Sequence, residues 1–175
     1  MFEIEIKVRI PDINTIREAI KAHGGIFSET LIEKDNYYNA PHRNFAETDE
    51  ALRIRETDNG TVMTYKGPKE TIQGSKVRSE TNLTINSGKD AETILQSLGF
   101  FRVAEVIKKR EYWKYQDFSI ALDEVEGLGS FIEIELLSDT DIAEVAARID
   151  RFSKELGIVG ERITVSYLEL LCSTP

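Results

Sequence analysis

The first ten residues alternate strictly between apolar and ionisable side chains. At the two-residue period of a β-strand, one face is wholly apolar and the other is wholly charged. The charged row consists of Glu3, Glu5, Lys7 and Arg9. Carboxylates at i and i+2 point the same way, roughly 7 Å apart along a strand. The row can hold a hard cation at one end and an anion at the other, or it can be the solvated outer face of a half-buried strand.

Length and composition favour one domain that spans residues 1–175. No apolar run approaches the length of a membrane span, and the charged first strand does not resemble a signal peptide. The single cysteine, Cys172, can form no internal disulfide, so a reducing, cytoplasmic location is expected. The net charge of -9 argues against a broad nucleic-acid or anionic-membrane surface, although it does not exclude a local basic pocket.

The rest of the chain predicts about eight strands and three sizeable helices. The expected strands are 1–10, 26–38, 52–55, 62–66, 76–85, 106–112, 119–125 and 131–137, with a hairpin turn at Asn59-Gly60. Helices are expected from Asp12 to the Gly24-Gly25 stop, over 89–98 and over 139–156, with a short one over 166–172. A polar loop is expected over 39–49. Gly67-Pro68 is expected to break its strand and begin a stretch that is a candidate lid or an ordinary surface loop.

The predicted strands share one unusual property, a face made almost entirely of charged residues. It carries nine bases and six acids, and it is therefore basic within an acidic protein. The helices need the apolar face to bury their own apolar stripes. The charged face then either lies open, as in a plain α+β sheet, or curls to line an interior. Charge of this density favours a tunnel that holds water, cation and polyanion, because a closed interior is otherwise costly for charged groups.

The two kinds of charge suit two parts of one ligand. Arginine forks and lysine ammonium groups suit a phosphate chain. Carboxylates suit Mg²⁺ or Mn²⁺, which bind phosphate oxygens together with one or two protein carboxylates. For each pair of opposite charges, a purely structural salt bridge across the sheet remains the alternative.

Residues spread in order over nearly the whole chain resemble those of the CYTH superfamily, the triphosphate tunnel enzymes. The motifs are Glu3-Ile4-Glu5-Ile6-Lys7, Leu52-Arg53-Ile54-Arg55, Thr64-Tyr65-Lys66-Gly67-Pro68, Arg78-Ser79-Glu80, Lys108-Lys109-Arg110 and Ser166-Tyr167. The stretch from Leu122 to Glu135 is similar to the class IV adenylyl cyclase branch, which includes the CyaB-like proteins. The resemblance implies an α+β fold in which an eight-stranded antiparallel β-barrel forms a tunnel with a polar lumen and helices packed outside. It also implies a homodimer.

The resemblance assigns the charged residues to roles. The metal ligands are expected to be Glu3, Glu5, Asp123, Glu133 and Glu135, for Mg²⁺ or Mn²⁺. The triphosphate is expected to be bound by Lys7, Arg53, Lys66, Arg78, Lys108 and Arg110, with Arg9 and Arg55 as second choices and Glu80 in support. The catalytic set is expected to be Glu3, Glu5, Lys7, Lys108 and Arg110. Lys76 lies at the edge of the 67–76 stretch and is left out of the site.

Three functions remain open. An adenylate cyclase, a phosphorus-oxygen lyase, would convert ATP to cyclic AMP and pyrophosphate. A triphosphatase would use water to attack the terminal phosphorus of a nucleoside triphosphate, tripolyphosphate or thiamine triphosphate. Catalysis in both is largely positioning and electrostatics, so the same phosphate-binding residues serve either. A non-catalytic triphosphate or polyphosphate binder is the third. The branch resemblance favours the cyclase, with ATP or another triphosphate as partner and no nucleic acid or membrane.

Overall fold

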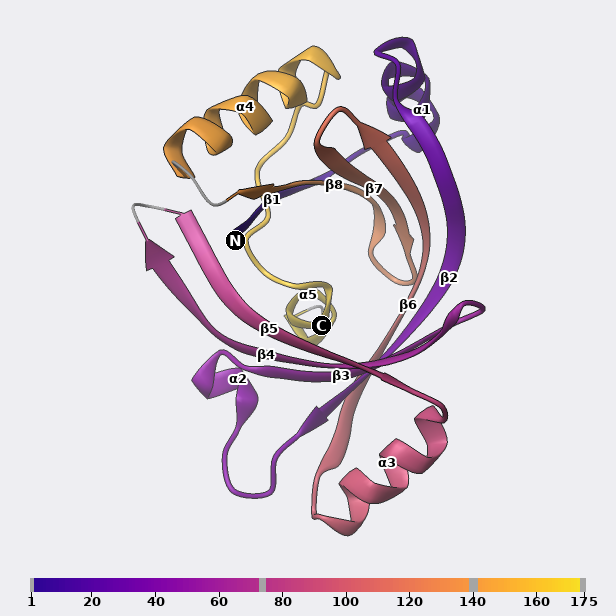
Figure 1. Ribbon diagram of the computed structural model, residues 1–175, viewed down its shortest axis with the longest axis vertical. Helices are drawn as coiled ribbons and strands as arrows, with labels where there is room; N and C mark the ends of the chain where they lie inside the picture. The colour runs from indigo at the N-terminus through magenta and orange to yellow at the C-terminus, as the bar shows by residue number, and fades with distance from the viewer. Residues whose placement is uncertain (1, 73–74, 139–141, 174–175) are drawn as a thin grey trace. The chain divides into compact units, whose positions relative to one another are not determined.

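The computed structural model describes the backbone of residues 2–72, 75–138 and 142–173. Side chains are described for the same residues except 2–3, 69–77, 138 and 142. Within these residues there are eight strands and five helices (Figure 1). The strands are β1 (Phe2–Arg9), β2 (Ile26–Asn39), β3 (Ala51–Thr57), β4 (Gly60–Ile72), β5 (Ser75–Ile85), β6 (Phe101–Tyr115), β7 (Phe118–Val125) and β8 (Gly129–Ser138). The helices are α1 (Ile13–Ala22), α2 (Phe45–Thr48), α3 (Gly88–Ser97), α4 (Ile142–Glu155) and α5 (Tyr167–Ser173).

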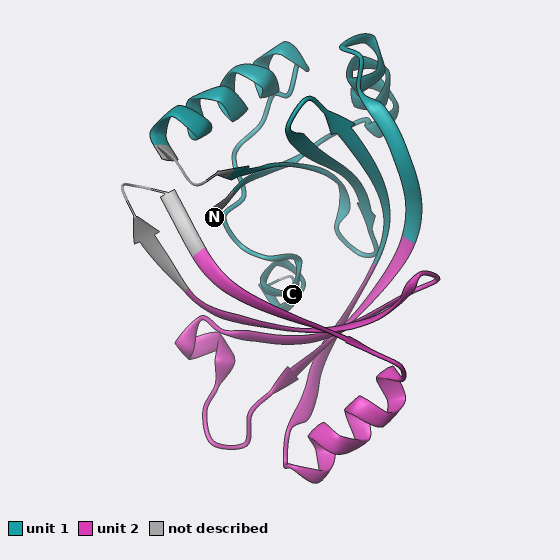
Figure 2. Cartoon of the chain, in the orientation of Figure 1, with its two compact units in different colours: residues 1–31, 71–77, 108–175 teal, residues 32–70, 78–107 magenta. Residues whose placement is uncertain are grey.

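The eight strands form one sheet with the order β1-β8-β7-β6-β2-β3-β4-β5. The pairs β1–β8, β8–β7, β7–β6, β2–β3 and β3–β4 are antiparallel. The prediction of an α+β fold built on eight antiparallel strands is confirmed. The chain divides into two compact units, coloured in Figure 2. Unit 1 comprises residues 1–31, 71–77 and 108–175, and unit 2 comprises residues 32–70 and 78–107. The expectation of a single domain stays a prediction.

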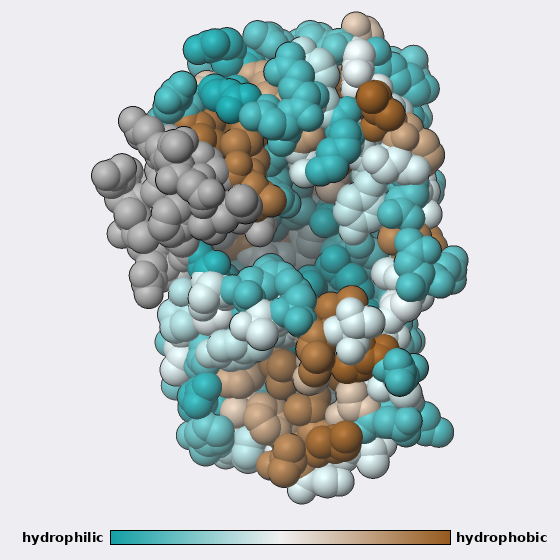
Figure 3. Space-filling view, in the orientation of Figure 1, coloured by the Kyte–Doolittle hydropathy of each residue, from teal (hydrophilic) through white to brown (hydrophobic). Residues whose placement is uncertain are grey.

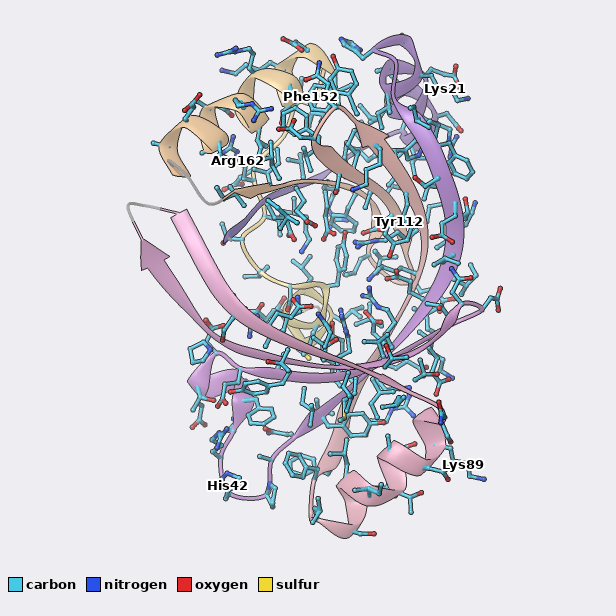
Figure 4. The ribbon with its side chains drawn as sticks, viewed as in Figure 1. Lys21, His42, Lys89, Tyr112, Phe152 and Arg162 are labelled. Atoms are coloured by element: carbon cyan, nitrogen blue, oxygen red, sulfur yellow. The ribbon has the colours of Figure 1, made fainter. Side chains whose placement is uncertain are left out.

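The core of unit 1 lies between the sheet and two helices. Alternate residues of β1, β8 and β7 point to one face, including Ile6, Ile134 and Leu122, which are almost completely buried. Helices α1 and α4 cover this face, and α4 contributes Ile149 and Phe152 (Figure 4). Burying each such side chain stabilises the fold by about 1.5–3 kcal/mol. The charged residues of the same strands therefore lie on the opposite face.

The C-terminal helix α5 lies on that opposite, charged face. In Figure 1, α4 and α5 lie on opposite sides of β1 and β8. The chain reaches α5 by running beside β1, where the backbone N–H of Ile163 donates to the carbonyl of Lys7 at 2.8 Å. The three sizeable helices of the sequence prediction pack on apolar surfaces, whereas α5 contributes to the charged one.

Unit 2 has its own apolar core. Leu52 and Ile54 of β3 pack with Tyr38 of β2, Phe45 of α2 and Leu95 of α3. In Figure 1, α2 and α3 lie on the same side of β3 and β4. The arginines of β3 alternate with its apolar residues and lie on the other face, as the sequence predicts.

Two expectations for unit 2 are wrong. The stretch expected as a polar loop contains α2, whose first turn is capped by the side chain of Asn44 and which ends at Asp49 in the left-handed region. Gly67-Pro68 does not break its strand, because β4 continues to Ile72. Pairing with β3 ends at Lys66, so the missing N–H of Pro68 costs no hydrogen bond to β3. Residues 73–74 of the candidate lid lie outside the described part of the chain.

Apolar side chains gather over part of unit 2 on the face shown in Figure 3. The exposed large apolar residues of this unit include Ile94, Leu98 and Phe101. No helix in the described part of the chain combines the length and the apolar character needed to cross a membrane.

An ion pair on the outer face of unit 1 makes the stability of the fold depend on pH. Arg17 of α1 donates to both oxygens of Glu111, at 2.9 and 2.6 Å, and this hydrogen bonding lowers the pKa of the buried Glu111 carboxyl. A lowered folded-state pKa gives stability that is present above the unfolded value and lost as pH falls through the folded value. We expect Glu111→Gln to cost about 2 kcal/mol at pH 7 and less below the ordinary pKa.

Urea unfolding at a series of pH values from neutral to acid measures this effect. The matched substitution Glu18→Gln, at an exposed position of α1, is the control. A Glu111→Gln protein whose stability deficit stays the same at every pH would contradict the prediction.

Candidate functional site

The charged face of unit 1 begins with two cross-strand pairs between β1 and β8. Glu5 lies directly opposite Glu135, and Lys7 lies directly opposite Glu133. The buried Lys7 Nζ is 3.3 Å from Glu133 Oε1 and 4.0 Å from Glu5 Oε1. The charged row predicted from the first ten residues is therefore present on β1, and carboxylates of β8 lie opposite its residues. The side chain of Glu3 lies outside the described residues.

Arg110 and Asp123 extend the face onto β6 and β7, where they are direct partners in the register. The guanidinium donates to both oxygens of Asp123, with Nε at 2.6 Å from Oδ1, and its Nη2 also donates to Glu133. The Asp123 side chain is completely buried. Both of its oxygens thus accept hydrogen bonds within the protein, although it was expected as a metal ligand. The metal role of Asp123 stays a prediction.

Tyr167, the first residue of α5, completes the cluster and is absent from the predicted site. Its hydroxyl donates to Asp123 Oδ2 at 2.6 Å. Lys7 Nζ lies 4.3 Å, and Lys108 Nζ 5.5 Å, from the centre of its ring. The local signal for this residue is the pattern Ser166-x-x-Glu169, a capping box that fixes the helix start and so places Tyr167.

The pKa values of two carboxyl groups of β8, Glu133 and Glu135, are shifted in opposite directions. Burial would raise the pKa of Glu133, but the charges of Arg110, Lys7 and Lys108 outweigh it and lower the pKa well below its ordinary value. Burial and the neighbouring Glu5 carboxylate raise the pKa of Glu135. A bound cation would reduce the repulsion between the Glu5 and Glu135 carboxylates. The negative end of the row is therefore at Glu5 and Glu135.

The Glu5–Glu135 pair fits a divalent ion that is shared with phosphate. Among the residues with described side chains, no group of three acidic, histidine or cysteine residues is arranged to hold a metal by itself. Mg²⁺ does not need one, because it takes one or two carboxylates and completes its shell with water and substrate phosphates. The donor set is carboxylate oxygen, which suits Mg²⁺ or Mn²⁺.

Arg9 lies at the far end of the row and is bound to the β7–β8 turn. Its guanidinium donates to the carbonyl of Leu128 and lies 4.6 Å from the centre of the Phe131 ring. These contacts hold the turn against β1. The structure thus places Arg9 on the expected strand but does not bring it to the Arg110–Asp123 pair.

Unit 2 contains a second charged cluster, and it includes acids that the sequence analysis missed. Glu33 and Asp35 of β2 are almost completely buried. Arg55 donates to both oxygens of Asp35, at 2.6 and 2.7 Å, and lies 3.0 Å from Glu33 Oε2. The mixed polarity of the β2 sequence hid this pair. Arg55 therefore has a structural partner for each side of its fork.

Arg53, two residues away on the same strand, is held much more loosely. It donates to Thr64 Oγ1 at 3.3 Å and lies 3.6 Å from Asp35 Oδ2. Among the described residues, its buried Nε has no hydrogen-bond partner. Thr64 in turn donates to Asn82. Of the two arginines of β3, Arg53 is therefore the one less committed to protein partners.

The other predicted bases of unit 2 have protein partners. Lys66 Nζ is 2.6 Å from Glu80 Oε2. Burial opposes ionisation of Glu80, but the Lys66 contact lowers its pKa below the ordinary value. Arg78 donates to two backbone carbonyls, of Gly67 at 2.5 Å and of Asp49 at 2.7 Å. Arg78 thus ties the end of α2 to β4.

Glu33 and Asp35 change the charge balance inferred from the sequence. They add two acids to the six counted on the charged face, so the excess of bases nearly disappears. Several predicted phosphate ligands are consequently paired in the protein itself. Unit 1 brings together Glu5, Lys7, Lys108, Arg110, Asp123, Glu133 and Glu135, and unit 2 brings together Arg53 and Arg55, with Lys66 and Glu80 as a further pair.

The contrast between Arg55 and Arg53 gives a matched pair of variants. Arg55→Ala leaves the carboxylates of Glu33 and Asp35 buried without their main partner, so we expect a loss of about 3 kcal/mol of stability. Arg53→Ala removes weaker contacts, and we expect a loss of about 1 kcal/mol. Urea unfolding measures both. Equal losses would show that the two arginines are held alike.

Comparison with known proteins identifies the family of this chain. Residues 1–167 match the CYTH domain. A Methanocaldococcus jannaschii protein named "Putative adenylate cyclase MJ0240" is 41% identical over 174 residues, which cover 97% of this chain and 98% of that protein. The "Adenylate cyclase CyaB" of Aeromonas hydrophila is 24% identical over 174 residues, covering 98% and 88% of the two chains.

Solved structures show the same fold. The PH1819 protein from Pyrococcus horikoshii OT3 is 38% identical and superposes with a TM-score of 0.86, covering 97% of this chain and 98% of that one. A Hippeastrum protein, HpAC1, is described as a putative adenylyl cyclase with a dominant triphosphatase activity. It has a TM-score of 0.75 at 21% identity, covering 99% and 96% of the chains. The family match over almost the whole sequence and the 41% identical relative establish that this chain belongs to the CYTH domain family.

Proposed function

We propose that the chain is a metal-dependent enzyme acting on a triphosphate, and that its reaction is the conversion of ATP to cyclic AMP and pyrophosphate. One observation carries the proposal. In unit 1, the carboxylate pair of Glu5 and Glu135 lies at one end of a row that continues into Lys7 and Arg110. A carboxylate pair for a hard cation beside bases for phosphate is the arrangement that a metal–triphosphate complex requires.

Each part of the row has a role in this reaction. Glu5 and Glu135, together with Glu3, which precedes Glu5 on the same predicted strand face, are the residues proposed to hold Mg²⁺ or Mn²⁺, which when bound would neutralise phosphate charge. Lys7, Lys108 and Arg110 orient the phosphate chain by donating to its oxygens. In the cyclase, the ribose 3′-hydroxyl gives up its proton to water, and its oxygen forms a bond to the α-phosphorus. The bond from that phosphorus to the bridging oxygen breaks, and pyrophosphate leaves.

In unit 2, Arg53 is the predicted phosphate-binding base that is least committed to protein partners. Its guanidinium makes longer contacts, at 3.3 and 3.6 Å, whereas Arg55 and Arg78 are committed to closer protein acceptors. We therefore assign Arg53 as a phosphate ligand and treat Arg55, Arg78 and Arg9 as residues that hold neighbouring elements in place.

A triphosphatase is the second candidate. The residues brought together in unit 1 grip phosphate and metal, and those functions are common to both reactions. The naming of the Methanocaldococcus and Aeromonas relatives supports the cyclase, while the activity stated for the Hippeastrum protein supports the hydrolase. A non-catalytic triphosphate binder is the third. A homodimer and a cytoplasmic location remain predictions.

Product analysis distinguishes the three. The purified chain is incubated with ATP and, separately, with tripolyphosphate, each with Mg²⁺, Mn²⁺ or EDTA. We expect cyclic AMP and pyrophosphate from ATP, only when a divalent ion is present. Release of orthophosphate from either substrate would contradict the cyclase assignment and support a triphosphatase. If tripolyphosphate binds but neither substrate is turned over under any of these conditions, the chain is a non-catalytic binding protein.

A further inference from the structure

Tyr167 lies at the centre of the charged cluster of unit 1. Its hydroxyl is bonded to Asp123, and its ring faces the ammonium groups of Lys7 and Lys108. The Tyr167 ring also has an apolar neighbour, Phe131. The two ring centroids are 5.0 Å apart, in an edge-to-face arrangement. The side chain thus contacts an acid, two bases and an aromatic ring from four different strands.

Asp123 transmits the Tyr167 contact to Arg110. The Asp123 carboxylate accepts from Arg110 at both oxygens and from Tyr167 at one of them, so the tyrosine limits rotation of the carboxylate. A two-point bond from a carboxylate fixes the plane of a guanidinium. Tyr112, labelled in Figure 4, is two residues from Arg110 on β6, and its ring centre lies 5.8 Å from the Arg110 guanidinium carbon.

The segment before α5 reinforces the same group of bases. Lys7 Nζ donates to the carbonyl of Val165 at 3.3 Å, in addition to facing the Tyr167 ring. Ser166 and Glu169 fix the start of α5 by reciprocal bonds, Ser166 N–H to Glu169 at 2.7 Å and Glu169 N–H to Ser166 at 3.2 Å. The C-terminal segment is therefore built to hold Tyr167 in one place.

We propose that Tyr167 is a positioning residue of the triphosphate site: its hydroxyl orients Arg110 through Asp123, and its ring places the ammonium groups of Lys7 and Lys108. This inference rests on the proposed function, since the three bases it places are the proposed phosphate ligands. The hydroxyl keeps its proton at neutral pH, as an ordinary tyrosine does, and burial and the charges of Glu133 and Asp123 raise the pKa of Tyr167 further.

Two substitutions separate the hydroxyl from the ring. Tyr167→Phe removes only the hydrogen bond to Asp123, and we expect kcat/KM to fall about tenfold with little change in thermal midpoint. Tyr167→Leu also removes the ring, and we expect a further loss together with weaker binding of tripolyphosphate in EDTA, measured by calorimetry. Tyr115→Phe is the matched control, because its ring packs against Phe152 away from the charged face.

A double-mutant cycle with Asp123→Asn tests the route through Asp123. If Tyr167 acts through this carboxylate, Tyr167→Phe should reduce kcat/KM much less in the Asp123→Asn background than in the wild type. Equal reductions in both backgrounds, or a Tyr167→Phe protein as active as the wild type, would overturn the inference. A wild-type protein that turns over neither ATP nor tripolyphosphate would instead remove the proposed enzyme function. In that case, comparing tripolyphosphate binding in EDTA by the wild type and by Tyr167→Leu would still test whether the Tyr167 ring positions the bases.

Discussion

Replacing Glu5 by glutamine is expected to abolish metal-dependent turnover while leaving the fold intact. The carboxylate of Glu5 faces that of Glu135 across the β1–β8 pair, and the two form the proposed cation site. An amide cannot supply the same negative charge, so the loss in kcat should be on the order of 100-fold or more. Steady-state turnover of the preferred substrate over a range of Mg²⁺ and Mn²⁺ concentrations measures it.

Stability separates this effect from a folding defect. Burial and the Glu5 carboxylate raise the pKa of Glu135, and the second of these causes is repulsion between the two carboxylates. Removing one charge should leave the thermal midpoint unchanged or slightly higher. Glu124→Gln is the matched control, because this exposed carboxylate pairs with Lys109 and should be neutral in both assays. Undiminished turnover by the Glu5→Gln protein would exclude Glu5 from the site.

Arg110→Ala is expected to lower both activity and stability. The guanidinium holds the buried carboxylates of Asp123 and Glu133 together, so its removal leaves two buried charges short of a partner. Removal of one member of such a cluster costs about 3–5 kcal/mol. Substrate binding should weaken as well, because a proposed phosphate ligand is lost. Urea unfolding and the KM for substrate report the two effects separately.

Two companion variants sharpen the result. Lys109→Ala, one residue away on the opposite face of β6, removes an exposed ion pair and should be close to neutral. Arg110→Lys keeps the charge but loses the planar fork, and it should recover part of the stability and little of the activity. An unchanged KM and kcat in the Arg110→Ala protein would show that Arg110 is only a structural residue.

Much of the fold could be predicted from the sequence because its periodicities are strong. The alternation in the first ten residues fixed the charged face of β1, and the Asn59-Gly60 pair placed the β3–β4 hairpin. The strand containing Gly67-Pro68 could not be predicted, because a proline is tolerated where a strand needs no hydrogen bond on one side. That condition depends on where β3 ends, which is a property of the pairing.

The partners of individual charged residues could not be predicted. Alternation assigns a residue to a face, but it does not say which neighbour across the sheet it meets. Arg53 and Arg55 look equivalent in sequence, yet Arg55 is bound by the acids of β2 while Arg53 retains an unpartnered N–H. Tyr167 was missed as a site residue for the same reason, because its contacts with Asp123 and Lys7 join distant parts of the chain.

The path of the C-terminal segment beside β1 has a consequence for when the charged cluster of unit 1 can form. Lys7 and the Val165 carbonyl that it contacts are 158 residues apart, so β1 is translated long before the segment that holds this contact. Contacts this distant in sequence form slowly. A nascent chain released before Tyr167 has emerged would already contain β1 and β8, but it would lack the group proposed to hold its bases in order.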